Sequence, residues 1–345
     1  MTSQITGTTF DKLMERIGWE IDRLMSLDTP GKGIVPALYA EAVSQVGGPL
    51  AMTAARRLHE AVSPGDVVGL ITGFPSRSFL GPGISETDGP VGAAFLARVV
   101  EEVLGAVPII ITETSLVKYS ASPCLAAGLL VTDVEHALLS KRGAVKASAV
   151  GILPFPTDDS AAQRETRHFF ETLQPKALVA IEMPSRAEDG FAHTAGGRRI
   201  VDDHLAKTDY FFDWAPEYKV LRIGLGDGGN EMGLGNLSQA LYTATPVGHT
   251  IAAHTLSDVP VVGASSNWAA YAIGACLEAL VSSTRVLRRI DLAGIIRRCA
   301  EEGAIDGGSL RPEPRVDGTP LEMNLAVVDM MAFLIERALE KAGAA

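Results

Sequence analysis

Residues 221–235 combine acidic side chains, an amide and closely spaced glycines in one short run. Asp227, Asn230 and Glu231 all belong to the motif Gly226-Asp-Gly-Gly-Asn-Glu231, which directly follows an apolar segment. Glycine accepts left-handed backbone angles and lets the chain approach a ligand closely. The pattern therefore predicts a tight loop whose polar groups converge on an ammonium group, a metal ion or a proton in transfer.

The same loop also fits the dinucleotide-binding pattern G-x-G-x-x-G between Gly224 and Gly229. In that motif, bare N–H groups at a helix start hold a pyrophosphate, whereas Asp227 would place a negative charge among them. The acid expected about 20 residues later, on the ribose, is missing, because residues 239–257 contain no Asp or Glu. The composition of the loop therefore argues against nucleotide binding.

Other polar residues also follow short apolar segments. Glu86, Asp88 and Gly89 come after the segment 67–74, and Glu113 comes after 107–112. Glu182 comes after 177–181, and Ser266 and Asn267 come after 259–264. Ligands of open α/β sheets bind outside the carboxyl ends of the strands, so we expect one shared site. The alternative for each residue is structural, as a helix cap or a solvated turn; Asp88 in particular suits the N-cap of a helix that starts at Gly89-Pro90.

The elements that must position these residues alternate along the chain. Apolar segments of strand length occur at residues 67–74, 107–112, 147–155, 177–181, 220–225 and 259–264, with helical stretches between them. This alternation predicts an α/β, doubly wound, mostly parallel sheet with flanking helices. We expect a single domain over residues 1–345. An N-terminal helical segment of about 8–62, with helices at 8–26 and 49–62, packs on it, and a final helix is expected at about 321–341.

Residues 184–200 are rich in Gly and polar side chains and are predicted to form a functional loop or lid. His193 lies there with Arg186, Arg198 and Arg199. An anionic substrate would need such an arginine. The alternative is that all three arginines are exposed, as most arginines are.

Charge and composition exclude several classes of partner. The net charge is −11, from 30 basic and 41 acidic residues, and no basic stripe suggests nucleic acid. No apolar run reaches membrane-spanning length, and no signal-peptide pattern is present, so we expect no membrane partner and a cytoplasmic location. The three cysteines, Cys124, Cys276 and Cys299, are far apart in the sequence, which favours buried thiols in a reducing compartment.

Several of these motifs together resemble the D-glutamate cyclase family, in its cyclase-like C-terminal region, formerly a domain of unknown function. The matching runs are Ile71-Thr-Gly-Phe74, Glu86-Thr-Asp-Gly-Pro90, Ile181-Glu182 with Asp189-Gly190, Gly226-Asp-Gly-Gly-Asn-Glu231 with Gly233 and Gly235, Ser266-Asn-Trp268 and Val316-Asp-Gly318. They extend from about residue 10 to 340. Phe191-Ala-His-Thr-Ala-Gly-Gly197 departs from the family's more aromatic pattern, and the large N-terminal domain and mitochondrial transit peptide of the vertebrate enzymes are not expected here.

The resemblance implies a lyase that cyclises D-glutamate, or a related small amino acid, to 5-oxo-D-proline with loss of water. Its catalytic candidates are Asp227 or Glu231 as the base, and Glu182, Glu86 or a divalent cation (Mg²⁺ or Mn²⁺) to neutralise the oxygen that leaves. Loop N–H groups and Asn230 would stabilise the oxyanion. The substrate-binding candidates are Asp88, Gly89, Glu113, Gly228, Gly229, Asn230, Ser266 and Asn267.

Two other functions fit the same residues. One is a metal-dependent hydrolase or lyase that acts on a small carboxylic acid, although the sequence assigns no metal ligands. The other is a non-enzymatic protein that binds a small ligand. The expected partner is a small-molecule amino-acid substrate, and the chain is a candidate homodimer.

Overall fold

The computed structural model describes residues 7–29, 31, 33–142 and 147–343. Its main sheet has seven strands in the order β3-β4-β2-β1-β5-β6-β7, and every neighbouring pair is parallel. The strands are β1 Val67–Thr72, β2 Val107–Glu113, β3 Leu130–Thr132, β4 Ala149–Phe155, β5 Ala177–Ile181, β6 Leu221–Gly226 and β7 Val259–Val262. The predicted α/β fold class is confirmed. The short edge strand β3 was not predicted.

Strand order reverses between β1 and β5. The chain builds one half of the sheet from β1 to β4, on one side of β5, and the other half from β5 through β6 to β7. Thr72 at the end of β1 is level with Ile181 at the end of β5. A reversal of this kind leaves a crevice at the carboxyl ends of the two central strands, where ligands of doubly wound folds bind.

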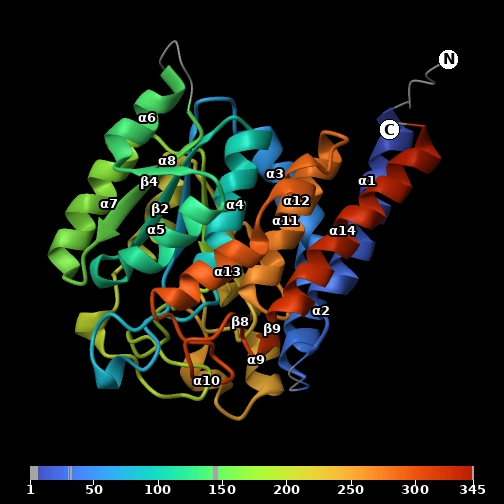
Figure 1. Ribbon diagram of the computed structural model, residues 1–345. Helices are drawn as coiled ribbons and strands as arrows, with labels where there is room; N and C mark the ends of the chain where they lie inside the picture. The colour runs from blue at the N-terminus through green and yellow to red at the C-terminus, as the bar shows by residue number, and fades with distance from the viewer. Residues whose placement is uncertain (1–6, 30, 32, 143–146, 344–345) are drawn as a thin grey trace.

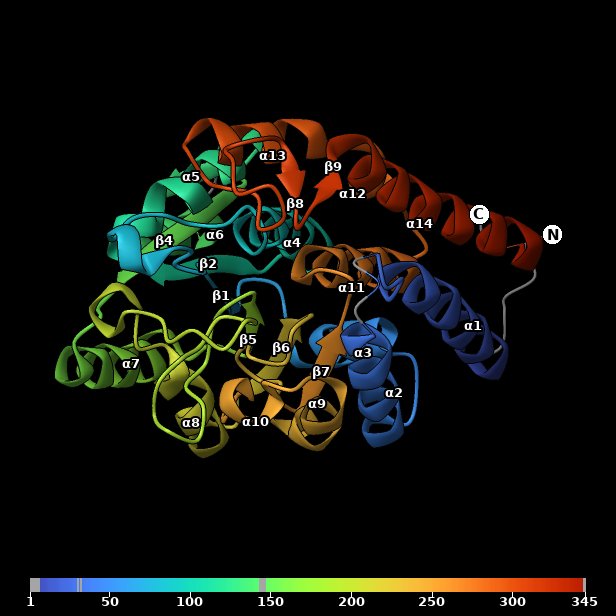
Figure 2. The ribbon, with the colours of Figure 1, turned by 90° about the horizontal axis from the view of Figure 1, so that it is seen from below.

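Helices cover both faces of the sheet (Figures 1 and 2). They are α1 Gly7–Met25, α2 Ile34–Val46, α3 Leu50–Ala61, α4 Pro90–Val103, α5 Val117–Ala126, α6 Val134–Arg142, α7 Asp159–Leu173, α8 Asp209–Tyr218, α9 Ser238–Ala244, α10 Gly248–Ile251, α11 Ser266–Leu280, α12 Arg285–Arg289, α13 Leu292–Glu301 and α14 Leu321–Ala342. The predicted helices at 8–26, 49–62 and 321–341 correspond to α1, α3 and α14. Helix α2 had no counterpart among the predictions. Within the part of the chain that the structure describes, no helix has the length and apolar character needed to cross a membrane.

Alternate side chains of each strand enter two different apolar cores. In β1, Val68 and Leu70 belong to the larger core, which α4 and α11 also build, whereas Val67 and Ile71 belong to the smaller core with residues of α7 and α8. Strand side chains alternate between the two faces of a sheet. Both faces of β1 are therefore buried, which explains why its sequence is a continuous apolar run.

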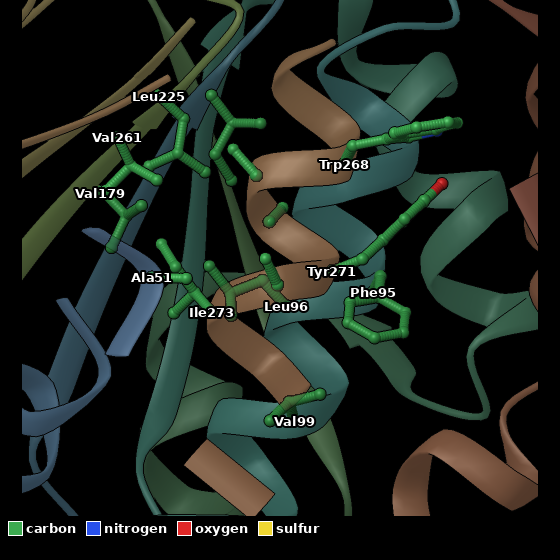
Figure 3. Packing of buried hydrophobic residues seen from close by; sticks show 14 of the residues in the cluster. Ala51, Phe95, Leu96, Val99, Val179, Leu225, Val261, Trp268, Tyr271 and Ile273 are labelled. Atoms are coloured by element: carbon green, nitrogen blue, oxygen red, sulfur yellow. The ribbon is translucent and has the colours of Figure 1, made fainter. Parts of the chain in front are cut away.

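Helix α11 is the centre of the larger core. Figure 3 shows its Tyr271 against Phe95 of α4, whose ring centroids lie 4.9 Å apart at 65°. Gly274 permits this approach, because a Cβ there would lie 2.6 Å from the Phe95 ring. The first residues of α4 and α11 are consequently held side by side, next to the carboxyl end of the sheet.

Candidate active site

A cavity of about 310 Å³ lies where β1, β5 and β6 end. Among the described residues that line it, one is basic, Arg77, and seven are acidic: Asp28, Glu86, Asp88, Glu182, Asp227, Glu231 and Asp317. The acids of the strand-end loops thus meet at the crevice that the strand order creates. Phe74, Ile34 and Val35 supply apolar parts of the wall.

Three of these carboxylates converge most closely. Asp88 precedes α4, Glu182 follows β5 and Asp227 follows β6, and one oxygen of each lies within 4.8 Å of the other two. Burial raises the pKa of each group well above its usual range, and neighbouring negative charges raise it further. The three groups, called the acid triad below, are therefore suited to hold a proton or to bind a cation.

Glu182 enters the acid triad from a strained backbone. Its φ is 48°, in the left-handed region that residues with a Cβ rarely adopt. The side chain is 7% exposed, and the Ser266 hydroxyl donates a hydrogen bond of 2.6 Å to its Oε2. Such strain concentrates at functional sites, where the surrounding structure enforces it.

Asp88 and Asn267 exchange hydrogen bonds between the starts of two helices. The Asp88 carboxylate accepts the N–H groups of Ser266 (3.0 Å) and Asn267 (2.8 Å), which begin α11. In return, Asn267 Oδ1 accepts the N–H groups of Gly89 (3.0 Å) and Gly92 (2.6 Å), which begin α4. The capping role considered for Asp88 at its own helix is wrong, because Gly89 is the N-cap of α4 and the Asp88 carboxylate binds the first two N–H groups of α11. Gly89, Ser266 and Asn267 are not among the lining residues of the cavity. Ser266 and Asn267 hold Asp88 in position through their N–H groups.

The glycine loop is folded around Glu231. The Glu231 carboxylate accepts N–H groups from Gly228 (2.9 Å), Gly229 (2.7 Å) and Asp227 (3.4 Å). Burial raises the pKa of Glu231, and these backbone donors oppose that shift. The loop N–H groups expected to face an oxyanion are thus engaged within the loop, so their part in the site is to fix Glu231 and the turn that presents Asp227.

Asn230 connects the loop to the predicted lid. Its Nδ2 donates to the main-chain oxygen of His193 (2.9 Å), and its buried Oδ1 has no hydrogen-bond partner among the described residues. Residues 184–200 form isolated β-bridges but no regular strand or helix, and three of them, Thr194, Ala195 and Gly196, line the cavity. Asn230 therefore offers an acceptor oxygen at a wall that the lid segment completes.

The three arginines of the lid segment do not line the cavity. Arg186 pairs with Asp213 at 2.6 Å, and the Arg198 and Arg199 guanidinium groups lie 4.5 and 3.0 Å from the ring centroids of Phe79 and Phe191. The cavity instead takes its guanidinium from Arg77, in the loop after β1. The sequence analysis did not predict Arg77 as a site residue. It could have been found by its position, because it lies in the loop that follows the predicted buried strand at 67–74.

Glu86 and Asp317 also belong to the acidic wall of the cavity. Burial raises the pKa of Glu86 to about 7, the Ser76 hydroxyl opposes this with a 2.6 Å hydrogen bond, and the charge of Asp317 adds to it. Asp317 arrives from the turn of a hairpin, β8 Arg315–Val316 with β9 Thr319–Pro320. Asp317 belongs to the family motif Val316-Asp-Gly318 but was not predicted as a site residue.

Glu113 does not join the other acids. It ends β2, and its carboxylate accepts the N–H of Ser115 at 2.9 Å, so it caps the short 3-10 helix Thr114–Leu116. Of the predicted site residues, the structure brings together Glu86, Asp88, Glu182, Asp227, Gly228, Asn230 and Glu231 around the cavity. It leaves Glu113 outside.

Known proteins match the chain over most of this architecture. A family described as D-glutamate cyclase-like, C-terminal, matches residues 21–332, which include the whole sheet and all the acids of the cavity. A protein of Homo sapiens named D-glutamate cyclase, mitochondrial, is 30% identical over 217 residues, which cover 62% of this chain and 33% of the human protein. The chain thus spans about a third of the length of that relative.

Proposed function

Because the chain belongs to the D-glutamate cyclase-like family, we propose that it is an enzyme that cyclises D-glutamate, or a closely related small amino acid, to 5-oxo-D-proline with release of water. The observation that carries this proposal is the acid triad, whose oxygens lie within 4.8 Å of one another in a cavity of about 310 Å³. A cluster of this kind exchanges protons with a substrate amine and a substrate carboxyl group.

The reaction forms one bond and breaks another. The substrate ammonium loses a proton, and its nitrogen attacks the side-chain carboxyl carbon to form the ring C–N bond. One carboxyl oxygen then leaves as water, and the two protons that it needs come from the original ammonium through the acids of the site. Because nucleophile and electrophile share one molecule, binding in a bent conformation supplies much of the rate enhancement.

We assign the base to Asp227 and not to Glu231. Both were candidates, but Glu231 is held by three backbone N–H groups. Burial and the charges of Asp317 and Glu231 raise the pKa of Asp227, and a carboxylate with a raised pKa is a stronger base. Glu182 and Glu86, whose pKa values are raised in the same way, then serve as the acids that protonate the leaving oxygen.

A divalent cation, Mg²⁺ or Mn²⁺, fits the acid triad. Hard oxygen ligands are what these ions prefer, and the buried Asn230 Oδ1, without a partner in the described chain, offers a further oxygen in the same wall. Among the described residues of the lining, seven acids and one arginine would otherwise repel an anionic amino acid. A bound cation would neutralise this charge and polarise the carboxyl group that is attacked, in place of the protons assigned above to Glu182 and Glu86.

The decisive experiment follows 5-oxoproline by chiral chromatography after incubation of the purified protein with D- or L-glutamate. Parallel samples contain EDTA, Mg²⁺ or Mn²⁺. We expect product from D-glutamate, loss of product with EDTA and recovery with one of the two ions. Failure to form 5-oxoproline from either enantiomer under all these conditions would remove the proposal.

The acid triad also favours a second candidate, a metal-dependent hydrolase or lyase that acts on another small carboxylic acid. Chelator-sensitive turnover of such acids, without cyclisation of glutamate, would support it. Tight binding of an amino acid without any turnover would support the non-enzymatic alternative. The cytoplasmic location expected from the sequence differs from the mitochondrial one in the human relative's name, and fractionation of expressing cells distinguishes the two.

A further inference from the structure

We propose that Arg77 forms a carboxylate-binding subsite, which holds the α-carboxylate of a zwitterionic amino acid while the ammonium group faces the acid triad. This inference rests on the proposed function and deepens it. It makes Arg77 a specificity-determining residue, because it selects substrates that keep a free carboxylate on the carbon that carries the nitrogen.

The first observation is that the Arg77 guanidinium has no partner within the described chain. Arg77 is half-buried and lines the cavity, yet no hydrogen bond or ion pair joins its side chain to any residue that the structure describes. Its charge acts on Glu86, whose pKa it lowers from beyond ion-pair distance. A guanidinium carries five N–H donors and is costly to bury without acceptors.

Comparison with other partly buried arginines makes this informative. Arg98 pairs with Glu102, Arg186 pairs with Asp213, and Arg222 pairs with Asp258, with N–O distances of 2.5 to 2.9 Å. Arg77 alone among these four lines the cavity that holds the acid triad, and its guanidinium makes no hydrogen bond or ion pair with a residue of the described chain. The arrangement favours an anionic group that comes from outside the protein.

The second observation is that the backbone of Arg77 is strained and held in place. Its φ is 54°, in the left-handed region. The next residue anchors this turn to the residues that follow the lid segment: the Ser78 hydroxyl accepts the N–H of Val201 (3.0 Å), and its carbonyl oxygen bonds with His204 Nδ1 (2.9 Å). The surrounding structure therefore enforces a conformation that a free loop would avoid, as is common for residues that bind ligands.

The described lining of the cavity thus offers groups of both charges. The acid triad attracts the ammonium group, and Arg77 attracts a carboxylate. Cyclisation consumes the side-chain carboxyl group, which must therefore lie beside the attacking nitrogen at the acid triad. The α-carboxylate keeps its charge throughout the reaction and in 5-oxoproline, so it is the group left for Arg77.

The test compares Arg77→Ala and Arg77→Lys with Arg198→Ala, an exposed arginine of the neighbouring lid segment that lies outside the cavity. Two measurements are made: kcat and KM for D-glutamate, and calorimetric affinities for D-glutamate, for its α-carboxamide and for 5-oxo-D-proline. Loss of a charged hydrogen-bonding partner should raise KM about 10- to 100-fold in Arg77→Ala, with kcat nearly unchanged because the interaction persists from substrate to transition state. Arg77→Lys should be intermediate, and Arg198→Ala should match the wild type.

The affinity series separates this subsite from a merely structural role. Wild type should bind D-glutamate more tightly than the α-carboxamide, and Arg77→Ala should bind both equally weakly. If Arg77→Ala unfolds, Arg77→Gly replaces it, because glycine adopts the left-handed angle without strain. Unchanged KM, a fall confined to kcat, or preserved discrimination against the α-carboxamide overturns the subsite.

The outcomes also distinguish this inference from the proposed function. If no 5-oxoproline forms but Arg77-dependent discrimination remains, the reaction is wrong and the subsite stands. If cyclisation proceeds and ignores Arg77, the subsite alone is wrong. If the wild type binds none of the three compounds, both are wrong.

Discussion

Buried carboxylates occur in two regions of this protein, and the two regions differ in the charges that surround them. In the N-terminal helices, Asp22 of α1 accepts the N–H groups of Leu50 (2.6 Å) and Ala51 (3.1 Å) at the start of α3 and the hydroxyl of Tyr39 (2.9 Å) in α2. At the carboxyl edge of the sheet, the members of the acid triad lie beside one another. Burial raises the pKa in both regions.

The difference shows that burial and a raised pKa do not by themselves mark a functional acid. What separates the two regions is the charge beside each carboxylate. Asp22 accepts three hydrogen bonds, joins three helices and has its pKa raised by burial alone. The members of the acid triad also accept hydrogen bonds, at Asp88 and Glu182, but neighbouring negative charges raise their pKa values further. Glu231 lies between these cases, because it lines the cavity but accepts three N–H groups.

The largest expected effect comes from Asp227→Asn, which removes the proposed base. Turnover should fall about 10²- to 10⁴-fold, the range typical of a general base. The free energy of unfolding should stay the same or rise, because one of the repelling charges is gone. Activity assays and urea unfolding of the same preparation measure both quantities. Near-normal turnover would exclude Asp227 from the mechanism.

Asp22→Ala should have the reverse effect. It leaves two buried N–H groups at the start of α3 without an acceptor, and such losses cost about 1–3 kcal/mol each. We expect the free energy of unfolding at pH 5 to fall by about 2–4 kcal/mol, while kcat of the folded protein stays normal. Asp22→Asn keeps an acceptor oxygen and is the milder control. A selective loss of turnover in Asp22→Ala would contradict the distinction between the two regions.

The smallest expected effect concerns pH. Burial raises the pKa of Asp22 from 3.8 to about 6. Between these values the unfolded chain has released the proton and the folded chain retains it, so unfolding releases a proton and stability falls as pH rises. One pKa unit corresponds to about 1.4 kcal/mol.

Relative to wild type, Asp22→Asn should therefore gain stability between about pH 4 and 6, by up to about 3 kcal/mol. Urea unfolding at several pH values measures the difference. Glu86→Gln is the matching variant in the cavity, with its window between 4.5 and about 7. A stability difference between Asp22→Asn and wild type that is flat with pH would show that Asp22 is already ionised in the folded protein.

The sequence predicted the parts of the fold that depend on periodicity and the parts of the site that depend on strand ends. The predicted strand at 177–181 coincides with β5, and parallel strands necessarily deliver Glu182 and Asp227 to one edge. Strand order was not readable from the sequence. It places β2 on the far side of β1 from β5 and β6, and Glu113 therefore ends away from the cavity.

The site residues that the sequence analysis did not predict lie in segments without helical or strand periodicity. Arg77 and Asp317 come from irregular turns with left-handed backbones, and their approach to the acid triad depends on contacts between segments far apart in the sequence. The same holds for the hydrogen bonds between Asp88 and Asn267, which are 179 residues apart. Such relations arise only when the helices are packed.

Asp88 couples ligand binding in the cavity to the stability of the helix packing, because it takes part in both. Its carboxylate contributes to the acid triad and at the same time anchors the first turn of α11. A ligand that neutralises Asp88 changes the strength of its hydrogen bonds to α11. Conversely, a shift of α11 relative to α4 moves an oxygen of the acid triad. The affinity of the cavity for such a ligand and the stability of the packing between α4 and α11 are therefore thermodynamically coupled.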